Sequence, residues 1–121
     1  VAFDGTTCSD DAADTIAAGD WLLSVATTVP GWMFLAVLRF HEGAGWDDLL
    51  EYLATADDPT NQPPFTDLPA STFLAGPASG RLVVSFGPGT YGFACLHGTT
   101  ESGSDATVTP GSGPFTVEAA P

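Results

Sequence analysis

The chain has 121 residues, among them 15 Asp or Glu, two Arg and no Lys, which gives a formal net charge of −13 at pH 7. Such a charge repels a phosphate backbone, so nucleic acid is excluded as a partner, and an anionic membrane surface is equally unfavourable. The length fits a single domain over residues 1–121. The abundance of glycine (14) and proline (10) favours a turn-rich β architecture.

The first twenty residues contain a short apolar start, residues 1–3, which predicts an edge strand. An acidic loop follows, with Asp10, Asp11 and Asp14. Clustered carboxylates suit Ca²⁺, but their spacing does not match an EF-hand loop, and an exposed acidic loop is the favoured interpretation. Residues 21–26 then form an apolar run that predicts a strand, and we expect a turn at residues 27–31.

The most hydrophobic run is residues 32–41. In an extended strand, alternate side chains point to opposite faces. One face would carry Phe34, Ala36, Leu38 and Phe40, and the other would carry Met33, Leu35, Val37, Arg39 and His41. Because both faces are mainly apolar, this run predicts a central strand that is covered on both sides.

The hydrophobic period changes from 2 to 3.6 at residues 46–54, which predicts a helix. Its apolar stripe consists of Trp46, Leu49, Leu50 and Leu53. We expect Leu49 and Leu53 to be buried, while Asp48 and Glu51 face water.

The segments that follow are interpreted mainly from their turn residues. Three prolines in residues 57–64 indicate a loop, and residues 65–77 have room for one short strand at 71–74. Residues 98–113 are rich in Gly, Ser and Thr, which predicts a mobile loop. Residues 115–118 alternate and predict a final strand.

Residues 81–98 read as two strands, 81–86 and 91–97, joined by a turn at Gly87-Pro88-Gly89. Four large side chains share one face of the second strand, namely Tyr91, Phe93, Cys95 and His97. The small residues Gly92 and Ala94, with Leu96, occupy the other face. A face this bare predicts a second layer lying close against it.

This stretch also carries a family resemblance. The motif PGTY-x-F-x-C with a nearby His, residues 88–97, resembles the cupredoxins, the blue-copper β-sandwiches. Residues 35–53, LAVLRFHEGAGWDDLLEYL, look like the strand-plus-helix insertion of some secreted cupredoxin-like domains. The resemblance spans roughly residues 20–97. It implies a mainly β fold, a cupredoxin-like antiparallel Greek-key β-sandwich with six to eight strands and one inserted helix at about 46–54.

The resemblance raises the question of copper. Such a centre needs a Cys thiolate, two His and usually an axial Met. Cys95 and His97 point the same way on a strand and form the candidate pair, which His41 would have to join. No His lies in residues 27–34 and no Met follows Cys95. Most of the family's ligands are therefore missing, and we predict no cofactor; a copper-binding electron-transfer or carrier protein that uses Cys95 and His97 is the alternative.

Two cysteines, Cys8 and Cys95, favour a single disulfide over a copper thiolate. Closing a loop across 87 residues would stabilise the fold by roughly 4–5 kcal/mol in the chain-entropy model. A disulfide suits an oxidising compartment, so we expect a periplasmic or extracellular location. No apolar run approaches the roughly 20 residues that span a bilayer, and residues 1–121 contain no basic n-region followed by an apolar segment, so no signal-peptide pattern is visible in them.

The functional expectation is a non-catalytic domain. No GxSxG motif occurs and no lysine is available as a base. We expect a structural or accessory subunit in a larger complex, membrane-associated complexes included, with a protein partner that offers a basic face. Trp32 and Trp46 are the candidate interaction residues. Together with Trp21 they would form a carbohydrate platform or, as the favoured reading, pack between elements.

Overall fold

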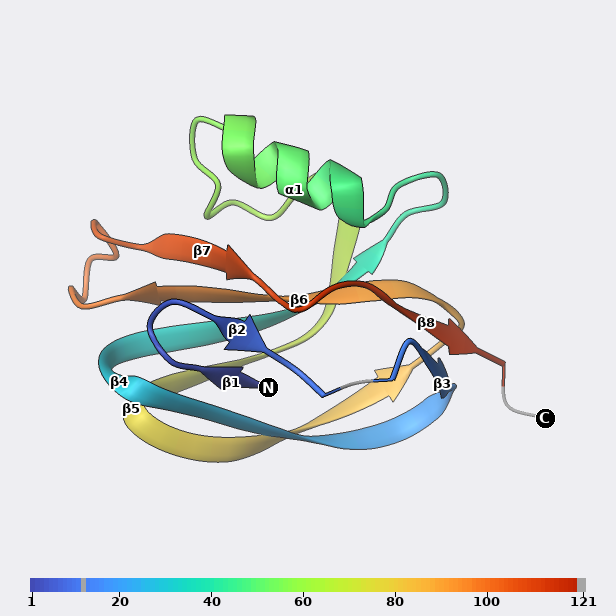
Figure 1. Cartoon of the computed structure of the whole chain (residues 1–121), viewed down its shortest axis with the longest axis horizontal. Coiled ribbons are helices and arrows are strands. Elements are labelled where there is room, and N and C mark those ends of the chain that lie inside the picture. Colours follow the sequence, from blue (N-terminus) through green and yellow to red (C-terminus); the bar gives the residue numbers. More distant parts are fainter. Residues whose placement is uncertain (12, 120–121) are drawn as a thin grey trace.

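A computed structural model describes residues 1–11 and 13–119 of the chain. Within that part the chain forms one helix and eight strands (Figure 1). In chain order the elements are β1 (Ala2–Phe3), β2 (Cys8–Ser9), β3 (Thr15–Ala17), β4 (Gly19–Phe40), α1 (Trp46–Thr55), β5 (Thr66–Phe86), β6 (Gly89–Gly98), β7 (Thr107–Pro110) and β8 (Phe115–Glu118). The predicted mainly β class with one helix is confirmed.

A long antiparallel ribbon of β4 and β5 dominates the fold. Its register runs from Gly19 opposite Phe86 to Phe40 opposite Thr66, with a shift between Thr27 and Gly31. The expected turn at residues 27–31 is therefore wrong. Gly31 has a φ of +97°, which glycine adopts without strain, and the extra residues bend β4 instead of ending it.

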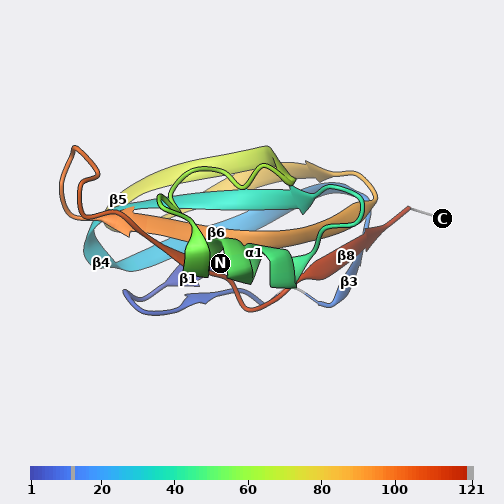
Figure 2. The ribbon, with the colours of Figure 1, turned by 90° about the horizontal axis from the view of Figure 1, so that it is seen from above.

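The bend in the ribbon creates the two layers of a sandwich. The second half of β4 pairs on its other edge with β6, from Trp32 opposite Gly98 to Arg39 opposite Tyr91. The first half pairs instead with β1, in parallel. Figure 2 shows the ribbon curling from one layer into the other. The antiparallel prediction holds for the long strands, whereas the short β1 and β3 pair in parallel with β4 and β8.

The stretch 81–98 is not a hairpin, although it contains two strands and a turn. The strand β5 pairs with β4, and β6 pairs with β4, β7 and β8. The turn at residues 87–88 therefore carries the chain from one layer to the other. Two further expectations are corrected here. The short strand at 71–74 is part of the 21-residue β5, and the loop predicted at 98–113 contains β7.

The main core lies between the two layers. It is built from large apolar side chains of both halves of β4 and of the strands around it, namely Phe3, Val25, Met33, Leu35, Val37, Val84, Phe86, Tyr91, Phe93, Phe115 and Val117. Cys8 and Cys95 lie in the same cluster and form a disulfide, with their Cα atoms 5.9 Å apart. The disulfide favoured from the sequence is thus present.

The helix α1 covers part of the outer surface of the β4–β6 layer. A second core forms there from Ala36, Leu38, Phe40, Leu49 and Ala94. The backbone N–H of Gly45 donates to the Asp48 carboxylate at 2.8 Å, which caps the helix. Leu49 is buried as expected and Leu53 is half-buried, but Leu50 is 41% exposed and does not belong to the stripe.

Among the described residues, no helix is long and apolar enough to cross a membrane, and α1 itself has ten residues.

Candidate docking face

The outer surface of β6 is bare, as the small residues predict, and tryptophan rings lie directly on it. A Cβ atom at Gly92 would stand 2.5 Å from Cζ3 of Trp46, and one at Gly98 would stand 2.8 Å from Cζ2 of Trp32. Both rings therefore need glycine beneath them. Trp46 belongs to the contact between α1 and the sheet, whereas Trp32 lies beyond the helix.

The part of this surface that α1 leaves open carries an aromatic face, which we define as Trp32, Phe34, Leu68, Phe73 and Leu96. Phe73 is 59% exposed, and Leu68 is exposed as well. The rings of Trp32 and Phe73 are nearly parallel, at 16°, with centroids 6.2 Å apart. An apolar surface of this kind on a folded domain is typical of an interaction site.

Trp32 is held in place by the loop after β6. Its indole N–H donates to the carbonyl of Thr100 at 2.8 Å. The carboxylate of Asp105 accepts hydrogen bonds from the backbone N–H and hydroxyl groups of Thr99 and Thr100. These bonds hold the pKa of Asp105 well below its usual range. At neutral pH the loop is therefore tied down, and Trp32 is preorganised for contact.

A small groove of about 60 Å³ continues the aromatic face towards α1. Among the residues that line it are Phe34, Leu38, Leu53, Pro59, Pro63, Leu68, Leu96 and Val108. It is apolar almost throughout, so it suits an aliphatic or aromatic side chain rather than a charged one.

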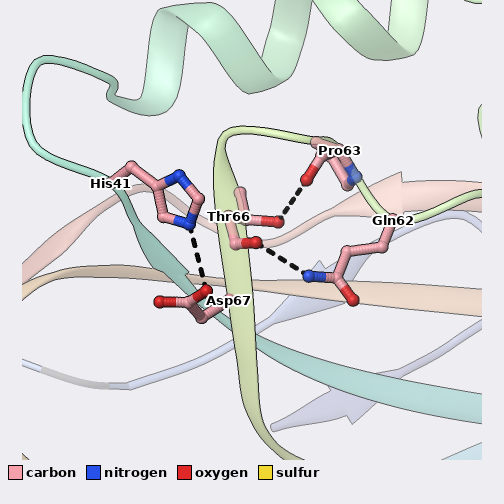
Figure 3. A network of polar contacts seen from close by, with 5 residues as sticks. All are labelled: His41, Gln62, Pro63, Thr66 and Asp67. Carbon is pink, nitrogen blue, oxygen red and sulfur yellow. Dashed lines mark hydrogen bonds and ion pairs between the residues drawn. The ribbon is translucent and has the colours of Figure 1, made fainter.

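The loop beside the groove is fixed to the start of β5 (Figure 3). The Gln62 amide donates to the carbonyl of Thr66 at 2.8 Å, and the Thr66 hydroxyl donates to the carbonyl of Pro63 at 2.8 Å. Close by, Nε2 of His41 lies 3.0 Å from a carboxylate oxygen of Asp67. The wall of the groove is thus built from hydrogen-bonded backbone, not from a loose loop.

Acidic residues gather in the segments that flank the aromatic face. They are Glu42, Asp47, Asp48, Glu51, Asp57, Asp58 and Asp67 around the helix and its loop, and Glu101 and Asp105 after β6. The two arginines lie elsewhere. Arg39 donates to the carbonyl of Pro88, and Arg81 pairs with Ser24 in the other half of the ribbon. The potential over the aromatic face is therefore negative.

The copper ligands considered from the sequence do not come together. The sulfur of Cys95 is bonded to Cys8. His97 lies opposite Met33 on β4, and His41 follows Met33 by eight residues, just beyond the end of that strand, which is roughly 26 Å at the rise of a β-strand. Among the described residues, no three His, Cys, Asp or Glu side chains are grouped to hold a metal ion. The residues present do not fit a blue-copper centre.

His97 instead has a structural environment. Its ring packs on Phe3 with centroids 4.3 Å apart, and its Nε2 lies 2.6 Å from the Thr107 hydroxyl. Burial lowers the pKa of His97, an effect that the nearby carboxylate of Asp105 partly opposes. The ring is therefore neutral at pH 7.

The three tryptophans do not form a joint platform. Trp21 lies in the first half of β4, where its indole N–H donates to the carbonyl of Ala17. There it lines a hollow of about 700 Å³ together with core aromatics such as Phe86 and Phe115. Asp10 also lines this hollow, and its carboxylate accepts a hydrogen bond from the backbone N–H of Ser112.

The sequence signalled Trp32 but missed Phe73 and Leu68. Within residues 65–77 one short strand was expected at 71–74, which includes Phe73 but not Leu68. The signal that marks Phe73 is the alternation of Ser71, Phe73 and Ala75 on one face, which is typical of a strand.

Comparison with known proteins gives one structural likeness. The chain is similar to dithionite-reduced auracyanin, a cupredoxin from the photosynthetic bacterium Roseiflexus castenholzii, with a TM-score of 0.46 and 16% identity over 99% of this chain and 97% of that chain. At these values no ligand and no residue role is transferred. No protein-family model matches the sequence, and no curated protein matches it either.

Proposed function

We propose that the chain is a non-catalytic interaction domain, a structural or accessory subunit that docks on a protein partner through the aromatic face. The observation that carries this proposal is the exposed Phe73 beside a Trp32 whose ring is already fixed. Aromatic side chains held in one conformation lose little entropy on binding, and they dominate the energetics of many interfaces.

The charge pattern supports a partner with a basic face. The aromatic face is bordered by the acidic segments around α1 and after β6, and the chain as a whole carries −13. Rim charges of one sign accelerate encounter with a surface of opposite sign and exclude acidic competitors. The groove beside Leu68 would receive an apolar side chain from the centre of the partner's surface.

The same proposal includes a periplasmic or extracellular setting. A buried disulfide between Cys8 and Cys95 persists where thiols are oxidised, and it is rare in reducing compartments.

The test is site-specific photo-crosslinking in the organism that makes the protein. A photoreactive residue replaces Phe73 in one variant and Thr116, which is exposed on β8, in the control. We expect one discrete crosslinked partner from position 73, lost when Leu68→Asp is added. Equal crosslinking from both positions, or none from position 73 in the native complex, would contradict the proposal.

A further inference from the structure

The strand β5 is an edge strand over its whole length. Among the described residues it pairs with β4 alone, and in Figure 2 it runs along the outer margin of the ribbon. Backbone N–H and C=O groups along such an edge can pair with another strand. Proline cannot donate, so Pro69 and Pro77 interrupt the first two-thirds of this edge. Residues 78–86 contain no proline.

This proline-free stretch presents exposed apolar side chains on the outer surface of its layer. Val83 is 66% exposed, the most exposed large apolar side chain of the described residues, and Leu22, directly opposite it on β4, is 57% exposed. Natural edge strands usually carry charges or prolines that prevent pairing. Here residues 78–86 carry one charge, Arg81, and the paired residues 19–27 of β4 carry one, Asp20.

We propose that residues 80–86 pair edge to edge with the same strand of a second copy, around a two-fold axis at Val83. Antiparallel pairing at this register places Val83 against its own copy and Arg81 against Ser85 of the second copy. The two Leu22–Val83 pairs then form one continuous apolar row across four strands, in which the two Val83 side chains contact each other across the axis.

The register also makes the charges complementary. Ser85 stands opposite Asp20, and its hydroxyl donates to the Asp20 carboxylate, which therefore leans towards the edge. Arg81 of each copy comes to lie two strands away from Asp20 of the other, about 10 Å between Cα atoms at ordinary strand spacing. An arginine side chain spans this gap, so each dimer gains two Arg81–Asp20 pairs.

This charge match is the reason to choose a second copy over an unrelated strand. Two chains that each carry a net charge of −13 repel each other at long range. At about 0.15 M ionic strength the Debye length is roughly 8 Å, so this repulsion is screened and the contacts within the interface determine whether the dimer forms. The dimer uses the first half of the ribbon and leaves the aromatic face, which lies on the second half, open. It goes beyond the proposed function and does not depend on it.

The test is sedimentation velocity of the full chain at physiological ionic strength over a range of concentrations. We expect a reversible monomer–dimer equilibrium. Val83→Lys should remove the dimer, whereas Phe73→Lys, which adds the same charge on an equally exposed position of the same strand, should keep it. Far-UV circular dichroism checks that both variants are folded. A wild type that stays monomeric, or a Phe73→Lys variant that alone loses the dimer, would overturn the proposal.

A charge exchange tests the register itself. Asp20→Arg and Arg81→Asp should each weaken the dimer, and the double variant should regain it, because each copy then meets opposite charge again. In addition, Val83→Cys should give a disulfide-linked dimer under oxidising conditions, and Phe73→Cys should not. A double variant that stays as weak as the single ones, or equal crosslinking by both cysteines, would overturn a two-fold axis at Val83.

Discussion

The two faces of β6 behave in opposite ways. On the inner face, Tyr91, Phe93 and Cys95 are buried against side chains of the other layer. On the outer face, Gly92, Ala94 and Gly98 contribute almost nothing of their own, and rings from elsewhere cover them. The inner face therefore fixes the fold. The outer face is covered by α1 over one half, and over the other half it carries the open aromatic face.

The largest loss of stability is expected from substitutions on the inner face of β6. Replacing both Cys8 and Cys95 by alanine removes the disulfide that joins β2 to β6, and in the chain-entropy model the free energy of unfolding should fall by roughly 4–5 kcal/mol. Denaturant unfolding of the oxidised wild type and the double variant measures it. A loss below about 1 kcal/mol would mean that the aromatic core alone specifies this layer.

The second-largest loss of stability is expected where α1 covers the outer face of β6. Leu49 is buried between α1 and the sheet, so Leu49→Ala should lower the free energy of unfolding by about 2–5 kcal/mol. Leu50→Ala, one residue away and exposed, should change it by less than about 0.5 kcal/mol. Similar losses at both positions in urea unfolding would show that the helix is not seated as described.

The need for a small residue beneath Trp46 can be tested directly by the variant Gly92→Ala. An added methyl group would meet the ring of Trp46, and forced overpacking of this kind costs about 1–3 kcal/mol. Gly87→Ala has open space around its Cβ position and serves as the control. Thermal unfolding of both variants should separate them clearly; equal Tm values would mean that Trp46 moves aside freely.

A smaller effect is expected from pH, through His97 on the inner face. Because burial lowers the pKa of His97 below its ordinary value of 6.5, the unfolded chain binds a proton that the folded protein does not. The free energy of unfolding should therefore decrease as pH falls below about 6.5, and be fully retained above it. His97→Gln should flatten this part of the profile, and an unchanged slope would contradict the environment described for the ring.

The smallest effect on stability is expected at the open half of the outer face. Asp105→Asn weakens the bonds that hold the Thr99–Thr100 backbone, and so loosens the ring of Trp32. We expect a slight fall in Tm but easier acrylamide quenching of tryptophan fluorescence. The Trp32→Phe background, in which the quenching difference should vanish, identifies the ring responsible.

The sequence predicted those parts of the fold in which the pattern is local. The alternation in residues 32–41 correctly assigned Leu35 and Val37 to one face and Ala36 and Leu38 to the other. The helical stripe placed α1 to within one residue at its end. The disulfide followed from the number and position of the cysteines.

The predictions were wrong where a strand continues through glycine or proline, residues that usually end a strand. Gly31 was taken for a turn, but with a partner strand on each edge it makes a bend. The strand expected at 71–74 was too short: β5 continues through Pro69 and Pro77, because proline is tolerated on an edge strand, where a missing N–H can face away from the sheet. The aromatic face was only partly predicted: Phe73 lies within the strand expected at 71–74 but was not identified as a surface residue, and Leu68 lies in the part of β5 that was missed.

The continuous ribbon has a consequence for how the chain reaches its fold. The pairing of β4 with β5 closes only the loop that contains α1, because Phe40 and Thr66 are 26 residues apart, whereas the pairings of β4 with β6 and of β3 with β8 join residues at least 52 and 101 positions apart. Contacts with a small loop to close form early, and distant pairings follow. During refolding we expect the β4–β5 pairing to acquire protection from hydrogen exchange before the pairings of β4 with β6 and of β3 with β8, so that the curved ribbon acts as a template for these distant strands.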